Sequence, residues 1–261
     1  MHQLSLVALY GKKDSLLSRV ILECQNKLAR IPGIRFKPYN ESQIHGTIIG
    51  LDRINMSKHN LNMHEYRNKC VDMNISGMLN FFRKGDALPF SVQIGGFQNK
   101  DYSFTSLKKR PFERSFQSIG NKVILIGWPI VKEPCDINNG LNNNLFPIQP
   151  RYPNSLDEIR KTCQQFNILH KYHSNPEDID NDFYFRIGTI DPAYIDTSLL
   201  QQTQQDIRHY LASIEPVFIE ITLDNIYIAS YKDDELPVGT TELWPINNKQ
   251  LSDDDIWKLY N

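Results

Sequence analysis

His45 and Thr47 are the two residues of this sequence whose types and spacing best suit chemistry, and they lie in the run 43–51, QIHGTIIGL. If this run is a β-strand, successive side chains alternate between its faces, so the imidazole and the hydroxyl share one face. Histidine transfers protons near neutral pH, and a neutral hydroxyl can hold a phosphate oxygen by a hydrogen bond. The pattern predicts one half of a metal-independent site for cleaving phosphodiesters. Taken alone, it also fits an ordinary half-exposed strand edge.

The segments before this run predict the elements that position it. Residues 4–10 alternate in the manner of a first strand. From Ser15, apolar side chains recur at steps of three and four residues, which indicates an amphipathic helix. Asp14 is placed to cap that helix, and the Pro-Gly pair at 32–33 is placed to end it. Residues 34–36 are then expected to be extended.

The rest of the chain mixes apolar strand patterns with amphipathic helix patterns, which predicts an α+β fold with antiparallel pairing. Strands are expected at 88–94, 123–128, 183–190, 217–223, 225–231 and 241–246, and helices near 71–82, 156–169 and 199–212, with a terminal helix capped by Ser252. We expect a single bilobal domain over 1–261, with halves of roughly 1–131 and 155–261. An Asn- and Pro-rich excursion at 132–154 separates the two halves.

Composition and charge bound the class of protein. Hydrophobic residues make up 40% of the 261 and charged residues 23%, which is typical of a soluble globular protein. A formal net charge of −1 argues against capture of duplex DNA, and no apolar run has the length needed to cross a membrane. The four cysteines are scattered, and Cys24 and Cys163 fall in expected helices as buried thiols. Together with a first segment that lacks a secretion signal, this predicts a cytoplasmic protein.

Other motifs give no sign of a cofactor. The HxxH at 170–173 and the pair His59 and His64 lack a carboxylate or thiol at familiar zinc spacing, so no metal is expected. The Gly-Lys-Lys triplet at 11–13 lacks the spacing of a phosphate-binding loop. The segment 98–120 interleaves lysines and arginines with aromatic residues. It predicts either a solvated hairpin or a contact surface for a phosphorylated ligand.

Taken together, the layout resembles the 2H phosphoesterase superfamily, which includes the bacterial 2'-5' RNA ligase-like cyclic phosphodiesterases. In that superfamily an early strand and helix lead to a strand bearing His-x-Thr. A similar tripeptide on a second strand faces it across a groove between two lobes. Residues 4–51 match the first half, with His45 and Thr47 at the motif positions. Later strands of the family are similar to the segments 88–96, 123–128 and 217–246.

The second motif departs from the family pattern. The matching strand is 183–190, and its best register places Tyr184 where the histidine would be and Arg186 where the threonine would be. Either the second histidine is absent, or a loop histidine such as His173 replaces it. Tyrosine, with a pKa of roughly 10, is a poor base at neutral pH, whereas arginine binds phosphate through two hydrogen bonds. Losing one of two proton carriers typically removes a factor of about 10²–10⁴ in rate.

The resemblance implies binding, and metal-free hydrolysis, of a nucleotide phosphodiester such as an RNA 2',3'-cyclic end or a cyclic oligonucleotide. His45 would act as general base or acid, and Tyr184 would be an auxiliary donor. Thr47 and Arg186 would hold the phosphoryl oxygens. Loss of the second histidine favours instead a catalytically inactive nucleotide-binding or protein-interaction module that kept the fold. A third interpretation, an unrelated α+β protein with an accidental motif, predicts that His45 and Tyr184 lie far apart.

Overall fold

The computed structural model describes residues 2–56, 59–85, 87–131, 151–173, 177–191, 196–248 and 251–261. Most of the excursion expected at 132–154 lies outside these residues, and only 151–154 of it is described. The described chain mixes helices with a large antiparallel sheet, so the α+β class expected from the sequence is confirmed.

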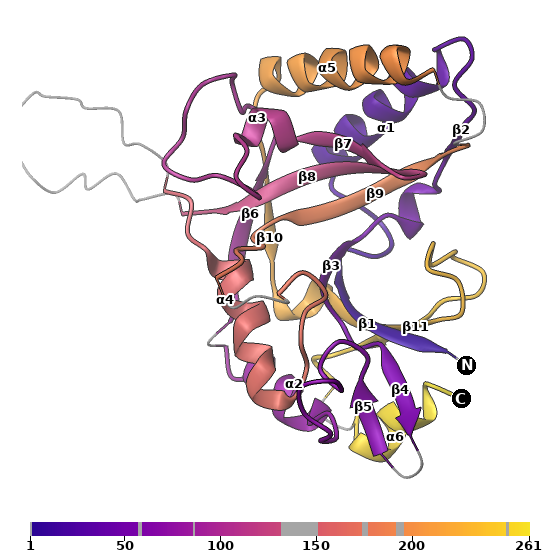
Figure 1. Ribbon diagram of the computed structural model, residues 1–261, viewed down its shortest axis with the longest axis vertical. Helices are drawn as coiled ribbons and strands as arrows, with labels where there is room; N and C mark the ends of the chain where they lie inside the picture. Colours follow the sequence, from indigo (N-terminus) through magenta and orange to yellow (C-terminus); the bar gives the residue numbers. More distant parts are fainter. Residues whose placement is uncertain are drawn as a thin grey trace, which may run out of the picture.

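The elements follow one another along the chain as Figure 1 colours them. The strands are β1 (Gln3–Ala8), β2 (Phe36–Pro38), β3 (Gly46–Gly50), β4 (Arg53–Met56), β5 (His59–Asn62), β6 (Phe90–Ile94), β7 (Phe116–Ile119), β8 (Lys122–Ile130), β9 (Phe183–Ile190), β10 (Val217–Ile221), β11 (Ile226–Tyr231) and β12 (Glu242–Pro245). The helices are α1 (Ser15–Ala29), α2 (Ile75–Arg83), α3 (Pro111–Arg114), α4 (Ser155–Thr162), α5 (Thr197–Ser213) and α6 (Asp253–Lys258). Short 3₁₀ helices are η1 (Glu41–Gln43), η2 (Cys163–Phe166) and η4 (Leu223–Asn225).

Within the described residues, ten strands form one sheet whose main order is β10-β6-β8-β9-β3-β1-β11-β12, with β2 also paired to β9 and β7 to β8. In the middle of this order, β3 meets β9 through the antiparallel pair Gly46 and Phe185. Strands from before and after 132–154 occur on both sides of this junction. The division of the chain at the excursion therefore does not coincide with the division of the sheet at β3 and β9.

Helices interlock the two halves of the sheet. α1, which follows β1 in the chain, packs beside α5 and contacts β2 and β9 in the other half. α4 precedes β9 in the chain but contacts β3. Figure 1 shows α1 and α5 at the end of the molecule opposite to β4, β5 and α6. Each half of the sheet is thus covered by a helix that the chain carries across from the other half.

The first helix begins where the sequence predicts. The Asp14 side chain accepts a hydrogen bond of 2.8 Å from the backbone N–H two residues later, which fixes the start of α1 at Ser15. Within α1 the thiol of Cys24 is free and buried, and Cys163 in η2 is free and buried as well, as expected. Cys135 lies outside the described residues.

Strand β9 divides its side chains between two faces of the sheet. Phe183, Phe185 and Ile187 are buried in the main core, which leaves Tyr184 and Arg186 on the opposite face. Two smaller apolar clusters form beside the main core; one comprises Val7, Tyr10, Ala229 and Leu236, and the other Phe97, Ile124, Ile126 and Trp128. The first cluster belongs to the half with β1 and β11, and the second to the half with β8.

Two regions differ from simple expectation. The polar stretch after β3 forms the two-stranded hairpin β4–β5, which the sequence did not predict because its residues show no apolar alternation. The consecutive segments predicted at 217–223 and 225–231 do form strands, β10 and β11. They lie on opposite sides of the β3–β9 junction, because β10 pairs with β6 and β11 pairs with β1.

The basic and aromatic segment 98–120 contains a loop, helix α3 and strand β7, which forms a hairpin with β8. Its loop ends in a tight turn in which Ser106 and Lys109 exchange backbone hydrogen bonds of 2.8 and 2.9 Å. The two central residues, Leu107 and Lys108, have φ values of 45° and 62°, a left-handed conformation that residues other than glycine rarely adopt. The Ser106 hydroxyl donates to the buried Asp182 carboxylate, so a tertiary contact stabilises this turn.

Candidate functional site

The β3–β9 junction places the segments 45–47 and 184–186 on neighbouring strands. Gly46 pairs with Phe185, so His45 and Tyr184, each next in the chain to one of these two residues, lie on neighbouring strands. The charge of Arg186 is close enough to His45 to lower the pKa of the imidazole. The backbone positions of His45 and Tyr184 are thus near each other, unlike what the interpretation of the motif as an accident predicts.

Close approach of the two strands requires the glycine between His45 and Thr47. A Cβ atom at Gly46 would lie 2.2 Å from the ring of Phe183, which is fully buried in the core. Side chains at 45 and 47 therefore turn away from the main core together, because 46 occupies the core face.

The His45 imidazole is held as a neutral base. Its Nδ1 lies 2.7 Å from the carbonyl oxygen of Gln43, which can only accept a hydrogen bond, so Nδ1 carries the proton and Nε2 the lone pair. Burial lowers the pKa of His45 to about 4; the bond to Gln43 opposes this shift, and the charges of Lys13 and Arg186 add to it. The Tyr10 ring stacks on the imidazole at a centroid distance of 5.7 Å.

Arg186 is the strongest anion ligand on this face, and it already has acidic partners. Its guanidinium lies 3.4 Å from an Asp234 carboxylate oxygen and 3.6 Å from one of Glu235. The Tyr39 ring lies against the guanidinium carbon at 5.3 Å from its centroid. Within the described part of the chain, the buried Nε of Arg186 has no hydrogen-bond partner.

Tyr184 is tied into a buried polar network instead of facing the strand beside it freely. Its hydroxyl donates to the Asp182 carboxylate at 3.1 Å and accepts from Arg114 at 3.1 Å. Asp182 also pairs with Arg114 and accepts from the Trp128 indole at 2.6 Å. Burial, followed by the charges of Asp182 and Asp180, raises the pKa of Tyr184. The phenol proton is therefore already donated to Asp182, and none is left for the auxiliary donor role predicted for Tyr184.

The backbone carbonyl oxygen of Thr47 accepts a hydrogen bond from a buried arginine. Arg160 of α4, itself fully buried, donates to the carbonyl oxygens of Thr47 at 3.0 Å and Ile48 at 2.9 Å. Its guanidinium also pairs with Asp180 at 3.3 Å. Arg160 therefore satisfies β3 carbonyls beyond Gly46, the single residue through which β3 pairs with β9.

His173, the alternative second histidine, lies in a buried cluster beside α4. Its Nε2 is 2.8 Å from an Asp157 carboxylate oxygen, and His170 Nε2 is 2.9 Å from one of Asp180. The two rings lie 5.3 Å apart, and His170 contacts Tyr172. Among the residues described, no group of three or more His, Cys, Asp or Glu side chains has the geometry of a metal site.

Lys13 is a residue of this site that the sequence did not single out. Its ammonium group is buried and donates to the carbonyl oxygens of Gly11 and Glu41, the latter at 2.9 Å. Burial lowers its pKa to about 8, and the Glu41 charge opposes that shift. The triplet at 11–13 fits no phosphate-loop spacing, so only the fold could reveal that this charge acts on His45.

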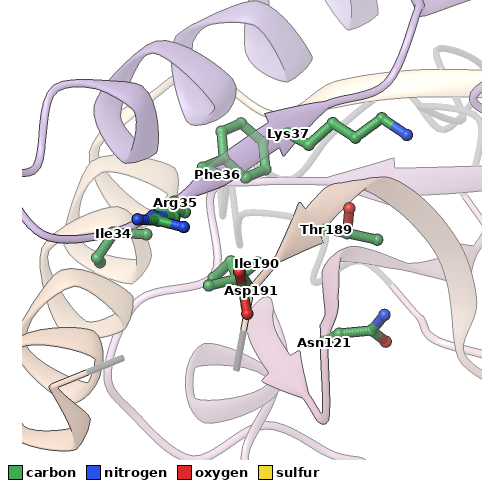
Figure 2. A pocket seen from close by; sticks show the side chains of 8 residues that line it. All are labelled: Ile34, Arg35, Phe36, Lys37, Asn121, Thr189, Ile190 and Asp191. Carbon is green, nitrogen blue, oxygen red and sulfur yellow. The ribbon is translucent and has the colours of Figure 1, made fainter. Parts of the chain in front are cut away.

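An open hollow of about 600 Å³ lies near the other end of β9, and Figure 2 shows the eight residues that line it. They are Ile34, Arg35, Phe36, Lys37, Asn121, Thr189, Ile190 and Asp191. Arg35 and Lys37 extend in opposite directions (Figure 2), so they do not converge on one anion. None of the four sequence-predicted residues lines this hollow.

The sequence matches no protein-family model, and no curated protein is significantly similar to it. In the parts of the chain that are described, no helix has both the length and the apolar character needed to span a bilayer.

Proposed function

We propose that this protein binds a nucleotide phosphodiester, such as an RNA 2',3'-cyclic end or a cyclic oligonucleotide, on the face formed by His45, Thr47 and Arg186. The observation that carries the proposal is the pairing of Gly46 with Phe185, because it gathers an imidazole, a hydroxyl and a guanidinium on neighbouring strands. In the proposal Arg186 holds phosphoryl oxygens as a charge-assisted donor, and the Thr47 hydroxyl adds a neutral hydrogen bond. Lys13 adds positive charge close to the imidazole.

His45 is the residue assigned to proton transfer. In hydrolysis, its Nε2 takes a proton from the attacking water while the new P–O bond forms, and the ester bond to the leaving oxygen breaks. The leaving oxygen then needs a proton, which the second histidine of the 2H phosphoesterases supplies. On the described face the Tyr184 phenol donates its proton to Asp182, so the leaving oxygen takes its proton from solvent water. We therefore propose slow hydrolysis at most, without a metal ion.

A catalytically inactive nucleotide-binding module is the second candidate, and the Tyr184 network favours it. A buried phenol held by Asp182 and Arg114 stabilises the fold but leaves the chemistry with a single proton carrier. Such a protein would sequester or sense its ligand. If neither binding nor turnover occurs, a protein-interaction role is left.

The arrangement of the sheet supports the resemblance to 2H phosphoesterases. On one side of the β3–β9 junction β3 is followed by β1 and β11, and on the other β9 is followed by β8 and β6. The two strands that carry the predicted motifs thus lie beside the junction, one on each side of it.

A direct test compares the protein with its His45→Gln variant in EDTA. 2',3'-cyclic nucleotides and cyclic dinucleotides are incubated with each, products are resolved by chromatography, and binding is measured by calorimetry. We expect binding by both proteins, and turnover that falls by about 10²-fold or more in the variant. Binding without product in either protein identifies the binding module. Equal turnover in both removes His45 from the mechanism, and the absence of binding contradicts the proposal.

A further inference from the structure

The connection between β11 and β12 carries three successive acidic residues, Asp233, Asp234 and Glu235. The carboxylates of the last two lie beside Arg186, the residue proposed to bind phosphate. We propose that the Asp234 and Glu235 carboxylates occupy the position of the ligand's phosphoryl oxygens, so that a phosphodiester binds by displacing them from Arg186. This inference rests on the proposed function, and it assigns the loop the role of an internal competitor.

The contacts of these carboxylates are those of a bound anion. Besides Arg186, Asp234 accepts a hydrogen bond of 3.1 Å from Lys122, and Glu235 lies 3.7 Å from the ammonium group of Lys37. Three cations from β2, β8 and β9 therefore converge on two carboxylates. Arginine recognises carboxylate and phosphate with the same planar set of donors, so the two kinds of anion compete for one guanidinium.

One donor on that guanidinium is left over. Among the described residues, the buried Nε–H of Arg186 has no acceptor, although the side chain has ion pairs through both terminal nitrogens. A buried N–H without a partner is uncommon, and a ligand that supplies an acceptor removes its cost. A phosphoryl group offers more oxygens than one carboxylate and can satisfy this donor.

Displacement of the carboxylates needs only side-chain rotation, because the backbone of the loop is held by its own hydrogen bonds. One of these comes from Arg186 itself, whose Nη1 donates to the Asp234 carbonyl oxygen at 3.3 Å and keeps this bond when the carboxylates leave. The Gln43 side chain donates to the Glu235 carbonyl oxygen at 2.6 Å, and the Tyr10 hydroxyl donates to that of Leu236 at 2.8 Å. The Asp234 side chain is 66% exposed, so its ion pairs are screened by water and weak. The Asp234 carboxylate can therefore leave Arg186 while the chain beneath it stays in place, whereas Glu235, whose side chain is 24% exposed, is held more firmly.

The loop also offers a matched control. The Asp233 carboxylate caps its own loop by accepting the N–H of Glu235 at 2.9 Å, and an asparagine keeps that acceptor. Asp233→Asn removes one negative charge next to the site without touching Arg186. Any gain it shows measures the general electrostatic effect of the loop.

The test is calorimetry with 2',3'-cyclic AMP in EDTA on the full chain, its Asp234→Asn/Glu235→Gln variant and Asp233→Asn. We expect the double variant to bind about three- to tenfold more tightly than the unaltered protein, and Asp233→Asn to stay within about twofold. Binding by the double variant alone also supports displacement. Equal or weaker binding by the double variant, or an equal gain in Asp233→Asn, overturns the inference and leaves the proposed function standing. No binding by any of the three overturns both.

Discussion

At the scale of single residues, the central feature of the site is the neutral imidazole of His45, on which the charges of Lys13 and Arg186 act. The His45 imidazole donates from Nδ1 to a backbone carbonyl and keeps its Nε2 lone pair, while Lys13 and Arg186 lower its pKa after burial has done so. An anion placed there offsets both positive charges and raises the proton affinity of the ring. The chemistry of His45 is therefore coupled to occupancy of the site.

His170 gives the clearest pH dependence of stability. Burial lowers its pKa to about 4, the Arg160 charge adds to the shift, and the bond to Asp180 opposes it. The unfolded chain, with a pKa of roughly 6.5, binds more protons between these values, so stability falls as pH falls through this window. We expect a loss of about 2 kcal/mol at pH 5 relative to pH 7 from this residue.

Urea unfolding at both pH values, on the protein and on His170→Gln, measures the contribution. The glutamine amide reaches the position of Nε2 and keeps a donor for Asp180 but does not titrate, so the variant should lose about 2 kcal/mol less on acidification. Identical losses in the two proteins would show that His170 is not the residue responsible.

At the scale of elements, the fold depends on how closely β3 approaches β9. Gly46→Ala places a methyl carbon 2.2 Å from ring atoms of Phe183, which is closer than non-bonded atoms can lie. We expect the variant to lose about 1–3 kcal/mol of unfolding free energy, because overpacking forces the strands apart. Chemical denaturation measures this, with Gly239→Ala as the control, since a Cβ at Gly239 meets no atom within 4 Å. A cost no larger than that of the control would mean that the strand contact is not tight.

Local sequence patterns predict much of the fold but few of the contacts around the site. The helix α1 with its Asp14 cap, and the alternation of β9, follow from periods that a sequence displays directly. The side chains that meet Asp182 come from Ser106, Arg114 and Trp128, each more than fifty positions away in the chain. No spacing rule joins such distant residues, and the same is true of the acidic loop on Arg186.

At the scale of the whole molecule, one arginine links the two halves of the sheet. Arg160 satisfies carbonyls of β3 and pairs with Asp180 on the segment that leads into β9. Helices α1 and α4 each cover the half from which they do not originate in the chain, so neither half is independent. We therefore expect unfolding to be cooperative over both halves.

Arg160→Met should cost about 3–5 kcal/mol, because it leaves the buried Asp180 carboxylate without its arginine and the carbonyl oxygens of Thr47, Ile48 and Asp180 without their donor. Arg19→Met, at an exposed position of α1, should stay within about 0.5 kcal/mol. Guanidinium unfolding followed by tryptophan fluorescence measures both. A single transition of reduced midpoint is expected for Arg160→Met, and a midpoint equal to that of the control would contradict this role.

The left-handed conformation of Leu107 and Lys108, at the surface, depends on the buried carboxylate of Asp182. Neither residue favours that conformation by itself, and the hydroxyl of Ser106 anchors the loop to Asp182. Transplanted into another protein without that anchor, the four-residue turn should relax into a different shape. Leu107→Asn together with Lys108→Gly would favour the turn by itself, because Asn-Gly readily adopts positive φ values, and the turn would then no longer depend on the contact with Asp182.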